Sequence, residues 1–281
     1  MSSSPDPLSP DWLGACRRAV EALRGVFAEH PTSRERVIET GDTGEGGDQT
    51  LVIDSEAEDA VFAQLDALHA AGARFTAVSE ERGVIEYGGG DVRVVIDPLD
   101  GSLNAKRGMT HFALSIAVAD GPTMADVRFG FVYDFGPREE WYALRGEGTW
   151  LNGRRIESSP DERREADGRL EIITFESADP RLLAPKIIAL SDLVNRLRAM
   201  GSIAISLCQL APTRVDGMFT LRATRSVDVA AAQLIVRETG GLVAFPAFDD
   251  PLGAPLDIEP HSRVVAARTP ESLAQLIAAL A

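Results

Sequence analysis

Lysine, cysteine and histidine are scarce in this sequence of 281 residues, which contains two lysines, two cysteines and four histidines. Cys16 and Cys208 lie in apolar helical patterns without CxxC spacing, which favours two buried thiols over a disulfide or a metal site. The histidines form no HxxxH or HExxH pattern, which argues against a zinc centre. The lack of lysine beside abundant arginine and alanine is interpreted as a compositional bias without a functional meaning.

Long hydrophobic runs are also missing. No apolar run approaches the roughly 20 residues that a membrane-spanning helix needs. The first five residues are polar and uncharged, and they resemble neither a secretory signal nor a basic anchor. We therefore expect a cytoplasmic protein without a membrane partner.

Positive charge is in deficit, because 28 basic residues face 43 acidic ones and the net charge is −15. A nucleic-acid partner is not expected, since such binding needs a basic surface that displaces counterions. A small anionic substrate stays possible, because bound cations can reverse the local field.

The order of the predicted elements indicates two parts. Residues 1–10 are predicted to be disordered, residues 11–156 to form an α+β metal-binding domain, residues 157–169 a linker, and residues 170–281 an α/β domain in which strands and helices alternate. Within the first part, residues 39–50 contain four glycines and four acids and are interpreted as a mobile loop. Within the second part, residues 181–190 are predicted to form one helix.

The stretch at residues 94–104 is the centre of the functional argument. An apolar run reaches Asp97, a proline follows, and Asp100 precedes a glycine and a serine. A turn without function is one interpretation. The aspartyl-phosphate phosphatase pattern is another, but it fits poorly because two residues separate the acids. Carboxylates and a main-chain carbonyl that hold Mg²⁺ are the third.

Further acids stand at predicted strand ends or helix starts: Asp54, Glu80, Glu81 and Asp228. Each has an ordinary explanation, such as a helix cap at Asp54 or a favourable charge in the first helical turn at Asp228. Together they place five or six carboxylates where a two-metal site could form. A metal makes such a cluster tolerable, because packed carboxylates otherwise repel one another or take up protons.

At this point the sequence resembles the inositol monophosphatase superfamily of Mg²⁺-dependent, lithium-sensitive phosphatases. Three motifs carry the resemblance in order and approximate spacing: Ser79-Glu80-Glu81, Asp97-Pro98-Leu99-Asp100-Gly101-Ser102, and Val227-Asp228-Val229-Ala230-Ala231 followed by Glu238-Thr239-Gly240-Gly241. The similarity covers roughly residues 11–270 and is closest to the prokaryotic and archaeal inositol monophosphatase/fructose-1,6-bisphosphatase branch. It implies a layered α-β-α-β-α sandwich of the inositol monophosphatase/fructose-1,6-bisphosphatase type, and a homodimer.

The resemblance also implies roles for individual residues and a cofactor of two or three Mg²⁺ ions. Direct hydrolysis follows from it: one ion lowers the pKa of a bound water that attacks phosphorus, and a second stabilises the leaving alkoxide. The implied metal ligands are Glu80, Asp97, the carbonyl of Leu99, Asp100 and Asp228; Asp54, Glu81 and Ser102 are the implied catalytic residues, and the N–H groups of Gly101 and Ser102 the implied phosphate donors.

The sequence departs from the family where substrates are selected. Val227 stands where the family usually has tryptophan, and residues 220–226 lack the acid that binds inositol hydroxyls in strict inositol phosphatases. Arg222 and Arg225 could meet a second phosphate or could lie in solvent. Gly201 and Ser202 complete the expected substrate-binding residues.

The expected function is that of a Mg²⁺-dependent phosphomonoesterase acting on a small polyol, sugar or nucleotide phosphate. A fructose-1,6-bisphosphatase and an adenosine 3′,5′-bisphosphate phosphatase are the alternatives within this class. A non-catalytic family member that works through protein contacts is the alternative from another class, although no metal acid is missing.

Overall fold

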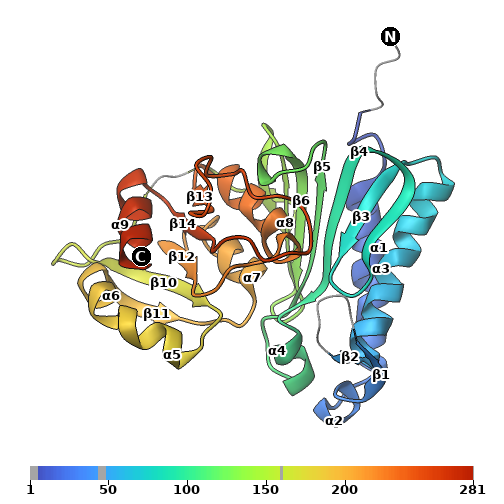
Figure 1. Cartoon of the computed structure of the whole chain (residues 1–281), viewed down its shortest axis with the longest axis horizontal. Coiled ribbons are helices and arrows are strands. Elements are labelled where there is room, and N and C mark those ends of the chain that lie inside the picture. Colours follow the sequence, from blue (N-terminus) through green and yellow to red (C-terminus); the bar gives the residue numbers. More distant parts are fainter. Residues whose placement is uncertain (1–5, 44–48, 159–160, 281) are drawn as a thin grey trace.

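The computed structural model describes residues 6–43, 49–158 and 161–280. Figure 1 shows five layers, from the blue helices on one side to the red and yellow helices on the other. This arrangement confirms the predicted α-β-α-β-α sandwich. The helical layers are α1 (Trp12–Glu29) with α3 (Val52–Ala70) outside the first sheet, α7 (Ile203–Cys208) with α8 (Ser226–Arg237) between the sheets, and α5 (Pro180–Leu183), α6 (Ile187–Leu193) and α9 (Pro270–Leu280) outside the second sheet.

The first sheet has seven strands that follow one another in chain order. They are β3 (Phe75–Ser79), β4 (Gly83–Asp100), β5 (Ala113–Ala119), β6 (Val127–Asp134), β7 (Glu139–Leu144), β8 (Gly148–Leu151) and β9 (Arg154–Arg155). The long strand β4 bends back, so that β3 pairs with both of its arms: Ser79 lies opposite Gly83 on one arm and Ile96 on the other. This bend places the second arm of β4, which ends at Asp100, between β3 and β5.

The second sheet has five strands in the order β11-β10-β12-β14-β13. They are β10 (Leu170–Glu176), β11 (Val194–Arg198), β12 (Gly217–Thr220), β13 (Leu242–Ala244) and β14 (Val265–Ala267). Strand β10 pairs in parallel with both β11 and β12, whereas β14 is antiparallel to its neighbours. The alternation of strands and helices predicted for this half is therefore present, with one antiparallel strand inserted.

Two local predictions differ from the structure. The segment expected as a loop contains the paired strands β1 (Glu39–Thr43) and β2 (Gln49–Leu51), while residues 44–48 of that prediction lie outside the described residues. The single helix predicted for residues 181–190 is divided into α5, a 3₁₀ turn η2 (Ala184–Lys186) and α6. Pro185 in this turn has no N–H to continue an α-helical ladder, which accounts for the break.

The smaller elements connect these layers. They are the short helices α2 (Ser33–Arg36) and α4 (Ser102–Arg107) and the 3₁₀ turn η1 (Met124–Asp126). Of the predicted disordered N-terminus, residues 1–5 lie outside the described residues; in residues 6–10, the Pro7 carbonyl accepts a hydrogen bond of 2.8 Å from Trp12 Nε1. Among the described residues, no helix combines the length and the apolar character needed to cross a bilayer.

The central hydrophobic core joins the two predicted domains. Helices α7 and α8 from the second part pack against strands of the first sheet, and residues such as Val95 and Trp141 share one buried cluster with Leu234 and Met218. Two further clusters lie under α1 and α3 and under α6 and α9. The proposed domain boundary therefore crosses a continuous core between the sheets.

Close contact between α8 and the first sheet depends on small residues. Gly130 on β6 is flanked on the neighbouring strands by Ala117 and Ala143. A Cβ atom at Gly130 would lie 2.5 Å from the carbonyl oxygen of Ala231 on α8, far inside van der Waals contact. The helix thus sits directly against the sheet backbone, and this contact fixes the place of the first turn of α8.

Gly130→Ala should lower the free energy of unfolding by about 1–3 kcal/mol, because the added methyl group overpacks the contact between β6 and α8. Gly25→Ala on α1 is the matched control: its Cβ meets no atom within 4 Å, and alanine in a helix should stabilise by about 0.5–1 kcal/mol. Urea unfolding of both variants measures the difference. Equal free energies in Gly130→Ala and the wild type would contradict this account of the packing.

Candidate active site

A β-bulge brings the two central aspartates to one face of the first sheet. Asp97 on β4 lies opposite Ser115, and Asp100 lies opposite Ala113, so three steps along β4 match two steps along β5. In a regular strand, residues three apart point to opposite faces. The extra residue in β4 reverses this relation and lets both carboxylates face the same side. The spacing that fitted the aspartyl-phosphate pattern poorly is thereby explained.

Most of the other predicted residues line a small cavity of about 50 Å³. Glu80 and Glu81 enter it from the turn after β3, and Asp54 enters it from the first turn of α3. Helix α3 begins at Val52, so Asp54 is a first-turn residue and the predicted capping role is wrong. The lining residues are Asp54, Glu80, Glu81, Asp97, Pro98, Leu99, Ser102 and Lys106.

Burial makes four acids of the site hard to ionise, and repulsion between carboxylates adds to this at Glu80, Asp97 and Asp100. Burial raises the pKa of Asp97 well above its ordinary range, and the charges of Glu80, Asp100 and Asp228 raise it further. Burial likewise raises the pKa of Asp100 to about 7, and it raises those of Glu80 and Asp228 although Arg225 opposes the shift. A bound cation would relieve this repulsion, because it favours the charged form of every acid near it.

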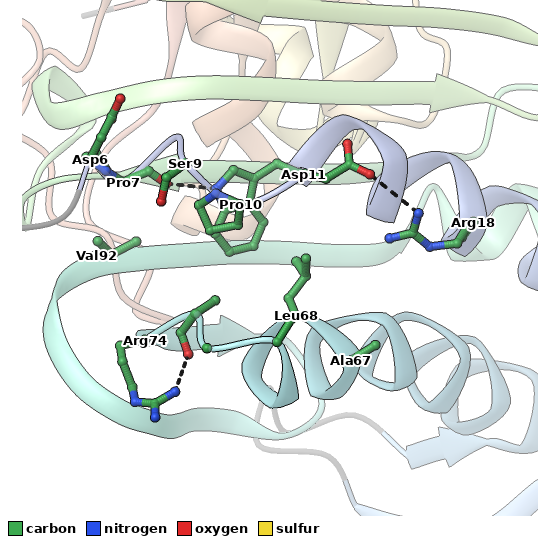
Figure 2. Close-up of a pocket in the computed structure, with 14 residues that line it drawn as sticks. Asp6, Pro7, Ser9, Pro10, Asp11, Arg18, Ala67, Leu68, Arg74 and Val92 are labelled. Atoms are coloured by element: carbon green, nitrogen blue, oxygen red, sulfur yellow. Dashed lines mark hydrogen bonds and ion pairs between the residues drawn. The ribbon is translucent and has the colours of Figure 1, made fainter.

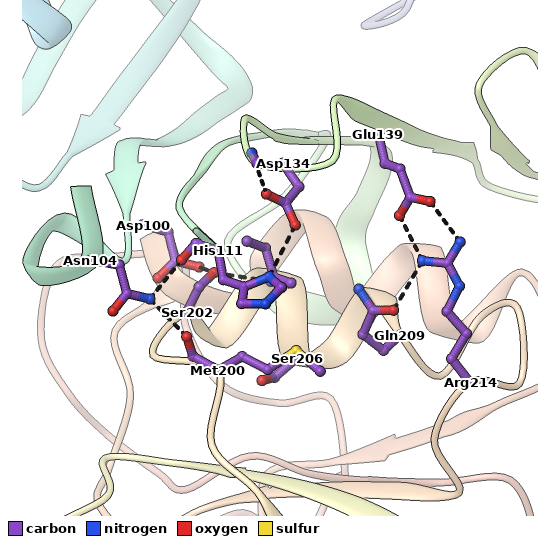
Figure 3. A network of polar contacts seen from close by, with 12 residues as sticks. Asp100, Asn104, His111, Asp134, Glu139, Met200, Ser202, Ser206, Gln209 and Arg214 are labelled. Atoms are coloured by element: carbon purple, nitrogen blue, oxygen red, sulfur yellow. Dashed lines mark hydrogen bonds and ion pairs between the residues drawn. The ribbon is translucent and has the colours of Figure 1, made fainter. Parts of the chain in front are cut away.

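Asp100 is held by the start of α7, as Figure 3 shows. Its Oδ2 accepts hydrogen bonds from Ser202 Oγ at 2.6 Å and from the Ala204 N–H at 2.7 Å. The N–H of Gly201 instead donates to the buried carboxylate of Glu176 at 3.0 Å. Ser202 is therefore brought to the acid cluster, where it orients Asp100, and Gly201 is held from the second sheet.

The turn after the bulge requires glycine. Gly101 has a φ of 83°, in the left-handed region, and a Cβ there would lie 2.7 Å from the carbonyl oxygen of His111. Ser102 begins α4 directly afterwards. The side chain of Asn104 donates to the carbonyls of His111 and Met200 at 2.9 and 2.7 Å, also visible in Figure 3. These contacts fix the main chain at Gly101 and Ser102.

Two basic side chains reach the acids directly. Arg225 pairs with Glu80 at 2.8 Å and with Asp228 at 3.4 Å, and Lys106 Nζ lies 3.0 Å from Asp54 Oδ2. Sequence reasoning missed Lys106; its place four residues after Ser102 on a short helix was the available signal. Arg225 was expected to face substrate or solvent, and it contacts the acid cluster.

A larger cavity of about 650 Å³ contains the remaining predicted residues Asp100, Gly201, Arg222, Arg225 and Asp228. Arg222 does not touch the acids but pairs with Asp179 at 3.1 Å, and its side chain is 60% exposed. Leu103 and Met109 are exposed apolar residues on the same wall. The cavity is thus lined by two arginines, by acids of the site and by apolar residues.

The acid cluster has the donor chemistry of a magnesium site, because carboxylates and a main-chain carbonyl are the hard oxygen ligands that Mg²⁺ takes. Within the residues that the structure describes, no three acidic, histidine or cysteine side chains already converge as ligands of one ion. Donors of the protein itself account for this. Arg225 holds oxygens of Glu80 and Asp228, the Leu99 N–H holds an oxygen of Asp97, and the start of α7 holds those of Asp100.

Another cavity, of about 570 Å³, lies away from these acids, between the segment before α1 and the end of α3 (Figure 2). Its charged side chains are Asp6, Asp11, Arg18 and Arg74, and Arg18 pairs with Asp11 at 3.5 Å. None of the predicted site residues lines it. The chemistry therefore favours the two cavities at the bulge.

Comparison with known proteins shows the family to which the chain belongs. A sequence profile of the inositol monophosphatase family matches residues 11–281. The chain belongs to the inositol monophosphatase family. Among relatives, the fructose-1,6-bisphosphatase/inositol-1-monophosphatase of Thermococcus kodakarensis is 35% identical over 202 residues, which cover 72% of this chain and 71% of that protein.

Two further relatives of this inositol monophosphatase family member carry the name SuhB. The Nus factor SuhB of Haemophilus influenzae is 39% identical over 171 residues, which cover 60% of this chain and 62% of that protein, so the match spans less than two thirds of that relative. The solved structure of the extragenic suppressor protein suhB of Bartonella henselae matches with a TM-score of 0.76 and 26% identity over 95% of this chain and 97% of that one. These matches confirm the predicted family and fold.

A buried acid outside the predicted ligands supports the turn that carries Glu80. Glu58 on α3 is 2% exposed, and its carboxylate accepts a hydrogen bond from Ser79 Oγ. Burial raises the pKa of Glu58 from 4.5 to about 7, against the opposing effects of Ser79 and Arg82. The folded chain therefore binds this proton more tightly than the unfolded chain does between these two pH values.

Glu58→Gln should remove a pH-dependent loss of stability. A raised folded-state pKa means that the contribution of Glu58 to wild-type stability is fully present below about pH 4.5 and is lost as the pH rises through about 7. In the presence of EDTA, Glu58→Gln should therefore gain on the wild type between pH 5 and 8, by up to about 3 kcal/mol. Urea unfolding at both pH values measures the gain, with exposed Glu29→Gln as the control. A gain that is equal at the two pH values would contradict the shift.

Proposed function

We propose that this chain is a Mg²⁺-dependent phosphomonoesterase that hydrolyses a small polyol, sugar or nucleotide phosphate. The observation that carries the proposal is the group of mutually repelling buried carboxylates at the bulge of β4, next to a cavity with two arginines. Membership of the inositol monophosphatase family supports the same chemistry.

The metal would be held by oxygen atoms from both halves of the chain. In this assignment the ligands are Glu80, Asp97, the Leu99 carbonyl, Asp100 and Asp228, for two or three ions. Bound Mg²⁺ supplies a water of lowered pKa and neutralises charge on the phosphate and the leaving group. Ser202 has a positioning role, since its hydroxyl holds one oxygen of Asp100.

The remaining residues act on the water and the phosphate. Ser102 and Asp54 line the small cavity together, and in this proposal they orient the attacking water. Lys106 holds Asp54 in place through its contact of 3.0 Å. The N–H groups of Gly101 and Ser102, fixed by the left-handed turn, would bind phosphate oxygens, with Glu81 beside them.

The alcohol part of the substrate would occupy the larger cavity. Arg222 and Arg225 favour a second anionic group there, because guanidinium binds phosphate through two donors. Leu103 and Met109 offer apolar contact to the carbon skeleton. A sugar bisphosphate fits this combination, and the fructose-1,6-bisphosphatase/inositol-1-monophosphatase of Thermococcus kodakarensis is named for such a substrate. Adenosine 3′,5′-bisphosphate is the alternative with two phosphates.

A second candidate function is a role through protein contacts. The relative from Haemophilus influenzae is named a Nus factor, and its 39% identity favours this candidate. All the acids of the proposed metal site are present in this chain, however. Burying so many carboxylates costs free energy, and a purely structural role would gain nothing from it. We therefore place hydrolysis first.

Asp97→Asn and Asp228→Asn should each lower Mg²⁺-dependent phosphate release by at least about 100-fold, because each removes a charged ligand while preserving size. Asp167→Asn is the matched control, since Asp167 is an exposed residue that pairs with Arg169 away from the site. Phosphate release is measured over about twenty phosphoesters with Mg²⁺, including fructose 1,6-bisphosphate, inositol 1-phosphate and adenosine 3′,5′-bisphosphate. Normal turnover in either site variant would contradict the assignment.

Calorimetric titration with Mg²⁺ separates the two candidate functions. A folded chain that binds no Mg²⁺ and releases no phosphate from any of the esters would favour the role through protein contacts. Mg²⁺ binding that Asp97→Asn abolishes would support the metal site even before the substrate is known.

A further inference from the structure

Arg225 occupies a place where acids, not a base, were expected to meet. The residue lies directly before α8, and its guanidinium contacts Glu80 at 2.8 Å through one nitrogen and Asp228 at 3.4 Å through another. Its side chain is 25% exposed. These two acids come from opposite halves of the chain, so Arg225 bridges the halves at the acid cluster.

The charges that face Arg225 are predominantly negative. Although burial opposes it, the carboxylates of Asp228, Glu80 and Asp97 raise the pKa of Arg225, so the guanidinium stays charged among them. The guanidinium therefore neutralises the same acids that a divalent cation would neutralise. The guanidinium and a cation would compete for Glu80 and Asp228, because both bind carboxylate oxygens and their positive charges repel.

The backbone of Arg225 is fixed while its side chain has a second place to go. The main-chain N–H donates to Asp228 Oδ2 at 2.9 Å, which anchors the residue at the start of α8. Its side chain also borders the cavity of about 650 Å³, and Arg222 borders the same cavity. Rotation about the side-chain bonds can thus carry the guanidinium from the acids into this cavity without any movement of the helix.

We infer that Arg225 is a built-in counter-ion that pairs with Glu80 and Asp228 when no metal is bound, and that divalent-cation binding releases its guanidinium into the neighbouring cavity to bind an anionic group of the substrate. This inference rests on the proposed metal site. It makes Arg225 a link between two binding events: the cation must displace the arginine, and the displaced arginine improves the site for a phosphate ester.

The first consequence is a limit on metal affinity. Part of the binding free energy of Mg²⁺ is consumed in breaking the contacts of Arg225 with Glu80 and Asp228. Removal of the guanidinium should therefore strengthen Mg²⁺ binding, whereas removal of an arginine that only supports the fold should weaken it or leave it unchanged. The sign of the effect distinguishes the two roles.

Calorimetric titration with Mg²⁺ in the absence of any phosphate ester tests this sign. Arg225→Gln should bind Mg²⁺ about tenfold more tightly than the wild type, equivalent to about 1.4 kcal/mol. Arg222→Gln is the matched control, because Arg222 lines the same cavity but pairs with Asp179 and not with the acids; its Mg²⁺ affinity should stay within about twofold of the wild type. Weaker or unchanged Mg²⁺ binding in Arg225→Gln overturns the inference.

Thermal unfolding gives a second readout that does not need activity. In EDTA at neutral pH, Arg225→Gln should melt below the wild type, because Glu80 and Asp228 lose their counter-ion, and saturating Mg²⁺ should remove the difference. Arg225→Lys keeps a positive charge and should have a Mg²⁺ affinity between those of the wild type and Arg225→Gln. A lysine variant that binds Mg²⁺ more tightly than the glutamine variant overturns the inference.

The side chain can also be followed in the wild type, should Arg225→Gln unfold in EDTA. Its Nε–H resonance, assigned from its absence in the spectrum of Arg225→Lys, should change position on addition of Mg²⁺ while that of Arg222 does not. An unchanged Arg225 resonance at saturating Mg²⁺ overturns the inference. Wild-type protein that binds no Mg²⁺ instead contradicts the proposed function itself, so the two failures are distinguishable.

Discussion

Repulsion between buried carboxylates is the constraint on which the rest of the site depends. The charge of Asp228 raises the pKa of Glu80, Asp97 and Asp100, and Arg225 lowers the pKa of Glu80 and Asp228. Three features around the acids counter this repulsion. They are the bulge that turns two aspartates to one face, the start of α7 that hydrogen-bonds Asp100, and the arginine before α8. Each supplies a donor or a positive charge to oxygens that would otherwise repel.

The acids are held by elements that lie between the two sheets. Asp100 belongs to the first sheet but accepts its hydrogen bonds from the start of α7. Asp228 lies in the first turn of α8, which packs directly on β6 at Gly130. Both helices lie in the layer between the sheets, where one hydrophobic cluster spans the two predicted domains. The geometry of the acids is therefore set by packing of helices on sheets, which is stiffer than a loop could be.

Sequence reasoning reached the acids through local patterns, and it reached the layered fold through the family resemblance that the motifs carry. Apolar periodicity located most strands and helices, and three short motifs located Glu80, Asp97, Asp100 and Asp228. The bulge and the contact of Arg225 with Glu80 were not accessible, since each depends on how distant elements pack. Lys106 had a local signal, its place on a short helix after Ser102, but its partner Asp54 comes from another element. The helix predicted at residues 181–190 failed for a local reason instead, the missing N–H of Pro185.

The net charge of −15 favours one order of binding for the metal and the phosphate ester at the site. A phosphate ester carries negative charge, and near the bulge it meets six acids that repel it. The two cations Arg225 and Lys106 oppose this repulsion, but both are already paired with those acids. Cation binding changes this balance twice if Arg225 is displaced: it neutralises the acids, and it returns a guanidinium to the cavity. Charge alone then favours the metal before the phosphate, since the phosphate entering first would face the uncompensated field of the whole chain.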